Sequence, residues 1–103
     1  MLLASEQKCL NALKLTVEKY YNEADYSILS YSECAVCLEK NNEIWEVYYG
    51  ERCTHHDSEV FTNILEACIS FIKQIGSNNN TKDMLQNFID YLTLSDISNK
   101  QAV

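Results

Sequence analysis

The spacing of apolar residues predicts a helix near the start of the chain. Apolar side chains recur there at intervals of three and four residues, which places them on one helical stripe. The stripe carries Leu10, Leu13, Val17 and Tyr20, and the opposite side carries Lys14, Glu18 and Lys19. Ser5 precedes the pattern and is a good N-cap residue. We therefore expect an amphipathic helix from Ser5 to about Asn22.

Alternation of apolar and polar residues predicts strands in the next part of the chain. Residues 26–31 are typical of a short first strand, and two longer alternating runs follow on either side of Asn41 and Asn42. Asn tolerates the positive φ that a tight hairpin turn requires. If these two Asn form the turn, the inner-face pairs are Leu38 with Trp45, Val36 with Val47, and Cys34 with Tyr49. The opposite face then carries Glu39, Glu46, Ile44 and Tyr48 as candidate contact residues.

Two more helices are predicted after the hairpin. Asp57 or Ser58 can cap the second helix, and Gly76 suits its C-terminal end. A third, shorter helix is expected from Thr81, with residues 95–103 as a flexible tail. The expected fold is a single α+β domain over residues 1–103, in the order α-β-β-β-α-α. Its small antiparallel sheet is packed on one face by helices.

Charge is distributed very unevenly along this sequence. Residues 23–66 contain ten acidic residues and only two basic ones, Lys40 and Arg52, which gives 2 − 10 = −8. The remainder has five acidic and six basic residues, or +1, and the whole chain carries −7. Carboxylates interleaved with Tyr and Trp favour binding to a basic protein surface. They disfavour nucleic acid, because a phosphate backbone would be repelled.

The size and composition indicate an ordinary globular domain. The chain has 103 residues, of which 47% are hydrophobic. No apolar run approaches the roughly 18 residues that a membrane span needs. The first residues show neither a basic segment nor a long apolar segment, so we expect no signal peptide and a cytosolic protein.

The five cysteines and two histidines raise the possibility of a zinc or thiol site. Cys34 and Cys37 form a C-x-x-C motif, and Cys53, His55 and His56 follow it. Residues three apart on a strand point to opposite faces, so the first two cysteines should diverge. Buried thiols are therefore favoured over a metal site. We interpret the histidines as part of a polar loop, with a Cys–His nucleophile–base pair as the less favoured alternative.

No motif in the sequence supports an enzyme. The chain lacks a G-x-S-x-G, an H-E-x-x-H and a glycine-rich loop that could cradle phosphate. With only two glycines in the whole chain, phosphate-binding loops have little room. We expect no catalytic residues, no metal and no cofactor.

One segment resembles a known family. The run Trp45-Glu46-Val47-Tyr48-Tyr49-Gly50-Glu51-Arg52, followed by Phe61, Glu66-Ala67-Cys68 and Phe71, resembles immunity proteins of bacterial polymorphic toxin systems. The resemblance is closest to immunity proteins of contact-dependent growth inhibition and covers about residues 24–75. It implies a small cytosolic protein that binds one toxin domain, frequently a nuclease, and occludes it.

The sequence therefore predicts an acidic contact surface for a cognate toxin domain in a 1:1 complex, with a ribonuclease favoured. The expected contact residues are Glu39, Glu43, Glu46, Tyr48, Glu51, Asp57 and Glu59. Three other functions remain open: a small acidic regulatory or adaptor domain without a toxin partner, a zinc- or thiol-dependent protein, and a nucleic-acid mimic. A run of carboxylates can also be no more than a solvated face.

Overall fold

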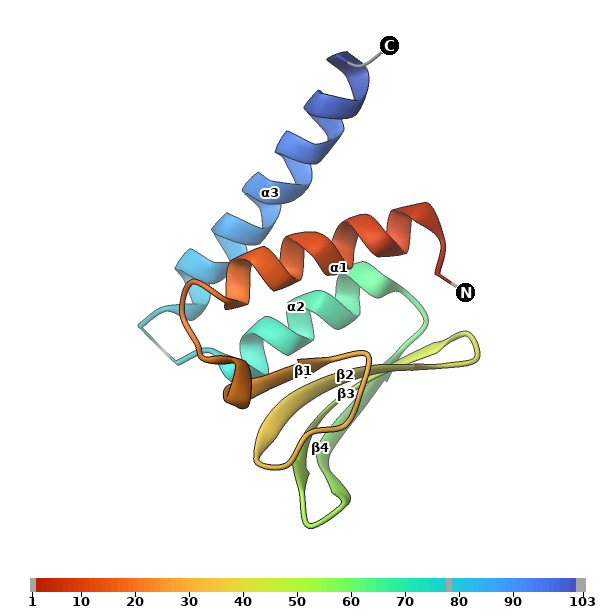
Figure 1. Ribbon diagram of the computed structural model, residues 1–103, viewed down its shortest axis with the longest axis vertical. Helices are drawn as coiled ribbons and strands as arrows, with labels where there is room; N and C mark the ends of the chain where they lie inside the picture. The colour runs from red at the N-terminus through yellow and green to blue at the C-terminus, as the bar shows by residue number, and fades with distance from the viewer. Residues whose placement is uncertain (1, 78, 102–103) are drawn as a thin grey trace.

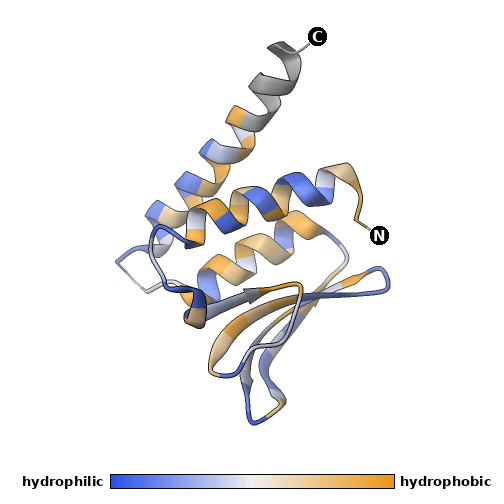
Figure 2. Ribbon diagram, in the orientation of Figure 1, coloured by the Kyte–Doolittle hydropathy of each residue, from blue (hydrophilic) through white to orange (hydrophobic). Residues whose placement is uncertain are grey.

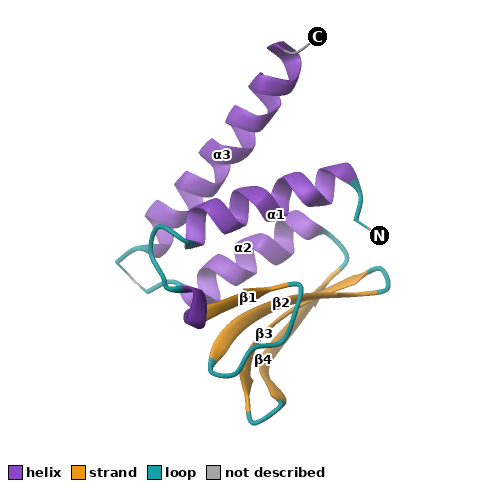
Figure 3. Ribbon diagram, in the orientation of Figure 1, coloured by secondary structure: helices purple, strands orange, loops and turns teal. Residues whose placement is uncertain are grey.

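The helices of this protein lie on one side of a four-stranded sheet (Figures 1 and 3). A computed structural model describes residues 2–77 and 79–101, with only the backbone for residues 95–101. The elements are α1 (Ala4–Val17), the 3-10 helix η1 (Glu23–Asp25), β1 (Tyr26–Ile28), β2 (Ala35–Asn41), β3 (Ile44–Glu51), β4 (Thr54–Phe61), α2 (Ile64–Ile75) and α3 (Thr81–Gln101). The predicted α+β fold, with helices on one face of the sheet, is confirmed.

The sheet is mixed rather than wholly antiparallel, and it has four strands instead of the expected three. Its order is β1-β2-β3-β4, and β1 runs parallel to β2, whereas the other neighbours are antiparallel. Leu29 and Cys34 both adopt a positive φ at the two ends of the loop between β1 and β2. The loop between these two bends brings the chain back to the beginning of β1, so β2 runs beside β1 in the same direction.

The additional strand, β4, occupies residues that were expected to form a loop and the first turn of a helix. Arg52 and Cys53 both have positive φ, the pattern of a type I′ turn, and they return the chain from β3 into β4. Helix α2 begins only at Ile64. Its N-cap is Asn63, not Asp57 or Ser58, and the Asn63 side chain accepts hydrogen bonds from the amides of Leu65 and Glu66.

The hairpin of β2 and β3 is confirmed, but its predicted register is wrong by two residues. Asn41 pairs with Ile44, so the turn consists of Asn42 and Glu43, and Leu38 pairs with Val47 instead of Trp45. Asn42 provides the positive φ, at 60°. A shift of two residues leaves each side chain of the two strands on its predicted face. Leu38 and Trp45 are accordingly in the core, as expected, with 0% and 1% of their surface exposed. The predicted inner-face pair of Cys34 with Tyr49 is wrong, because Cys34 precedes β2, is exposed and has a positive φ.

Helix α2 is the central element of the core. It packs on β2, β3 and β4, and α1 packs against its other side. Figure 2 shows that most of the α2 ribbon has the colours of apolar residues, as expected for a helix covered on both sides. Ala67, Cys68, Phe71 and Ile72 are fully buried, and Gly76 follows the helix directly.

Helices α1 and α3 complete the helical layer. Leu10, Leu13 and Val17 of α1 are buried as predicted, although the helix begins before Ser5 and ends at Val17. Helix α3 starts at Thr81, as predicted, and packs Met84 and Phe88 into the core. It is longer than expected and continues to Gln101. None of the helices, within the described residues, combines the length and the apolar character that a membrane crossing requires.

Candidate functional site

The acidic part of the sequence folds into the sheet. Residues 23–61, which run from η1 to the end of β4, contain nine acidic and two basic residues, or 2 − 9 = −7. All other residues together contain six of each sign and sum to zero. The uneven charge along the sequence therefore becomes a separation of charge in space, because the segment that forms the sheet is negative and the remainder, which contains the helical layer, is neutral.

Tyr48 lies at the centre of the face of the sheet that points away from the helices, which we call the outer face. Its side chain was expected to be exposed, but 0% of it is accessible. The His55 ring stacks on it at 3.6 Å with an interplanar angle of 4°, and Tyr31 stacks from further away. Its hydroxyl donates a 2.5 Å hydrogen bond to Glu39. Burial and the Glu39 carboxylate raise the pKa of Tyr48, so it remains a neutral donor. Tyr48 therefore supports the outer face and is not available as a contact residue.

Glu39 and Glu46 face each other directly across β2 and β3, and His55 bridges them. Two carboxylates in opposite positions repel each other. The His55 Nδ1 atom is 3.0 Å from Glu46 Oε2, and Nε2 is 3.9 Å from Glu39 Oε2. Ser58 also donates a hydrogen bond to Glu46 Oε2. Burial opposes ionisation of Glu46, but the Ser58 and His55 contacts outweigh it and lower its pKa. His55 thus lies in a strand with defined partners, and the expected polar loop is wrong.

The same three residues form the one group, among the described side chains, that could hold a metal ion. The ligand atoms of Glu39, Glu46 and His55 lie within 4.8 Å of one another. Three protein ligands and a water are typical of catalytic zinc. However, the two ring nitrogens of His55 face different carboxylates, so one carboxylate would have to move. No cysteine belongs to the group: Cys37 is buried in the outer face, and Cys34 is exposed before β2.

The loop between β1 and β2 holds the β3–β4 turn in place at one end of the outer face. The Tyr31 hydroxyl donates to Glu33 and accepts from the Cys53 amide, and Glu33 accepts from the Arg52 amide. The Tyr31 and Arg52 hydrogen bonds lower the pKa of Glu33, and burial raises the pKa of Tyr31 to about 12. Gly50 permits this close packing, because a Cβ there would lie 2.4 Å from the Ser32 carbonyl oxygen. The β3–β4 turn is therefore held by the loop.

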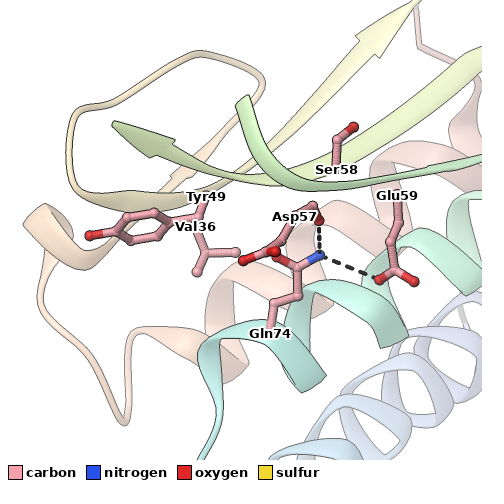
Figure 4. Close-up of a pocket in the computed structure, with 6 residues that line it drawn as sticks. All are labelled: Val36, Tyr49, Asp57, Ser58, Glu59 and Gln74. Carbon is pink, nitrogen blue, oxygen red and sulfur yellow. Dashed lines mark hydrogen bonds between the residues drawn. The ribbon is translucent and has the colours of Figure 1, made fainter. Parts of the chain in front are cut away.

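Asp57 and Glu59 belong to a different surface from Glu39 and Glu46. Figure 4 shows them beside Gln74 of α2, in a cavity of about 570 Å³, whereas Ser58 points away from it. The Gln74 amide donates to the Asp57 carbonyl and to Glu59 Oε1, and Ser70 donates to the same Oε1 atom. Asp57 has a positive φ at a β-bulge opposite Tyr48. These contacts fasten β4 to α2.

Glu43 and Glu51 lie at opposite ends of β3. Glu43 belongs to the turn between β2 and β3, and Glu51 ends β3 just before the turn to β4. The seven predicted contact residues consequently do not form one patch. Glu39 and Glu46 meet over the buried Tyr48, Asp57 and Glu59 line the cavity beside Gln74, and Glu43 and Glu51 lie apart at the two ends of β3.

Sequence reasoning missed the structural role of His55 and the strand position of Val60. The weak alternation of Thr54–Phe61 hid the strand, because six of its eight residues are polar. In the sequence, His55 was considered only for its closeness to Cys53, two residues earlier. Nothing in that spacing indicates that the His55 ring stacks on the ring of Tyr48. The bulge at Asp57 also shifts the alternation midway, so that Val60 and Phe61 fit a helical stripe as well as a strand.

Comparison with protein-family models, with curated proteins and with solved structures gave no match to this chain.

Proposed function

We propose that this chain is an immunity protein that binds and neutralises a cognate toxin domain in the cytosol. The partner is a basic nuclease, with a ribonuclease favoured, and the complex is 1:1. The observation that carries the proposal is the concentration of charge in residues 23–61, which form the sheet with its loops and η1 and carry −7, while the rest of the chain is neutral.

Carboxylates suit this task for a physical reason. Active sites that handle phosphate are rich in Lys, Arg and His, so a negative protein surface occupies the place of the substrate's charge. Such a field also accelerates association with a basic partner. The negative charge would repel nucleic acid itself, which favours a protein partner.

The accessibility of the sheet supports the proposal. Within the described part of the chain, the helices pack on the inner face of the sheet, and the outer face is covered only by side chains of the sheet and of the β1–β2 loop. Seven of the eight residues of β4 are exposed, and this strand forms an edge of the sheet. A partner can therefore approach the acidic layer without displacing any helix.

The test is to co-express the chain with the toxin domain encoded directly upstream of its gene and to score growth. The decisive variant is Glu43→Lys with Glu51→Lys, because neither side chain supports the network around Tyr48. We expect this double reversal to weaken protection and to slow association with the toxin. Its matched control is Glu18→Lys with Asp90→Lys, which changes the net charge equally on the helical layer.

The outcomes discriminate clearly. If the chain neither binds that domain nor restores growth, the immunity function is wrong and a regulatory or adaptor role is favoured. If both reversal variants weaken binding equally, only the net charge matters and the sheet is not the contact surface.

A further inference from the structure

A groove runs along the tip of the β2–β3 hairpin, beside the N-terminus of α1 and the end of β4. It has a volume of about 1200 Å³. The lining residues that matter here are Leu3, Glu6, Lys40, Glu43, Ile44 and Val60, together with Glu46. Three of these are apolar and strongly exposed, at 65% for Leu3, 46% for Ile44 and 64% for Val60. Single exposed apolar residues are ordinary, but three in one groove mark an interaction site.

The apolar side chains of the strands are arranged on one face. Val60 pairs directly with Glu46, and Ile44 lies two residues before Glu46 on the same strand. Side chains two apart share a face, so Ile44, Glu46 and Val60 all point outward. An incoming side chain would contact aliphatic groups and a carboxylate at the same time.

The charges of the residues that line the groove favour a partner with positive charge. Lys40 is the one cation among the lining residues, and its Nζ atom is 2.9 Å from Glu6. The ammonium also lies 5.4 Å from the centre of the Trp45 ring, so it is turned toward the protein. The remaining acids, Glu43 and Glu46, leave the lining with 1 − 3 = −2. Both hydrogen bonds of Glu46 use Oε2, which leaves Oε1 for a partner.

We propose that this groove is the docking site for an apolar side chain of the toxin domain that is flanked by Lys or Arg. The inference rests on the proposed function and makes it more specific. The aliphatic chain packs on Ile44 and Val60, and the flanking cations meet Glu43 and Glu46. Leu3, the N-cap of α1, lines the helical side of the same groove. A second copy of this chain is the wrong occupant, because it would bring two chains of charge −7 together.

The proposal relocates the predicted contact surface. It keeps Glu43 and Glu46, adds the three apolar residues, and excludes the buried Tyr48. A few residues that lose all their water carry most of the affinity at protein interfaces, whereas charges at the rim mainly set the association rate. Ile44 and Val60 should therefore control dissociation, and Glu43 should control association.

The experiment measures binding of the full chain to a catalytically inactive form of the toxin domain encoded upstream. The key variant is Ile44→Thr with Val60→Thr, which retains β-branched residues in the strands and removes apolar surface. We expect its Kd to rise about tenfold or more, mainly through faster dissociation, with an unchanged circular dichroism spectrum. Ile89→Thr is the matched control, because Ile89 is 53% exposed on α3. It should bind as the wild type does.

Each failure has a distinct meaning. If the wild type binds and the double variant binds equally well, the groove is wrong while the immunity function stands. If the wild type does not bind the toxin domain at all, both proposals are wrong. If the wild type elutes as a dimer and the double variant as a monomer, a second copy occupies the groove, and the toxin contact proposed here is overturned. If the circular dichroism spectrum shows that the double variant is unfolded, the test passes to Glu43→Gln. The proposal then requires that this variant associates more slowly than the wild type while its spectrum is unchanged.

Discussion

Glu6 is a mostly buried carboxylate that ties the start of α1 to the sheet. Its Oε1 atom accepts hydrogen bonds from the Leu3 amide and from Lys40 Nζ, each at 2.9 Å. Nothing in the periodicity of the sequence indicates this pair, because Glu6 and Lys40 are 34 residues apart. The Leu3 hydrogen bond, followed by the Lys40 contact, lowers the pKa of Glu6.

The lowered pKa predicts an acid-sensitive contribution to stability. A carboxyl group whose pKa is lower in the folded than in the unfolded state stabilises the fold when the pH is above the ordinary pKa of the group, near 4.5. This contribution is lost as the pH falls below that pKa and through the lower pKa of the folded state. We expect Glu6→Gln to reduce the free energy of unfolding at pH 7 and to weaken its dependence on pH below about 5. Urea unfolding at several pH values measures both. Glu18→Gln, at an exposed position, is the control for the removal of one carboxylate. Identical profiles for Glu6→Gln and the wild type would exclude the role of Glu6.

Among the elements, the hairpin of β2 and β3 shows what a local pattern can specify. Alternation assigned the side chains of Ala35–Asn41 and Ile44–Glu51 to the correct face, because a strand has a period of two residues, but it wrongly extended the inner face to Cys34. It did not assign the partners, because a shift of two residues preserves every face. The φ of 60° at Asn42, together with the pairing of Asn41 with Ile44, places the turn at Asn42 and Glu43.

The position of this turn can be tested with two substitutions. A β-branched residue is strained at positive φ, so Asn42→Val should destabilise the protein by about 1–2 kcal/mol. Asn41→Val, in contrast, should be neutral or slightly stabilising, because Asn41 is a strand residue and Val favours strands. Chemical denaturation of both variants gives the comparison. Equal destabilisation by the two changes would favour the turn at Asn41 and Asn42 instead.

Strand β4 shows where element prediction reaches its limit. Its polar composition has little alternation, and the bulge at Asp57 breaks what remains. Pairing with β3 stabilises this edge strand, and the hydrogen bonds of Ser70 and Gln74 to Glu59 add contacts with α2. These contacts are long-range, so they override the weak local preference of the segment.

At the scale of the whole molecule, charge is separated between a negative sheet segment and a neutral remainder, which we expect to steer the approach of the proposed toxin partner. Electrostatic steering raises association rates by about 10–1000-fold and is screened by salt. We predict that association with the proposed toxin partner slows by at least about tenfold between 0.01 and 0.5 M NaCl, while dissociation changes little. Stopped-flow or biosensor kinetics at several salt concentrations provide the measurement. An association rate that does not depend on salt would contradict steering by the acidic sheet.

The sequence by itself determined that three helices form, though not where each begins and ends, and it determined the inner face of the hairpin and the acidic character of one half of the chain. Each of these depends on residue type and short-range spacing, which a single sequence displays directly. Only the tertiary structure decided the hairpin register, the parallel β1, the strand at Thr54–Phe61 and the burial of Tyr48. These features depend on contacts between distant residues, such as the stack of His55 on Tyr48 and the contact of Glu6 with Lys40. Their free energy arises only when the layers pack together, so local patterns carry no trace of it.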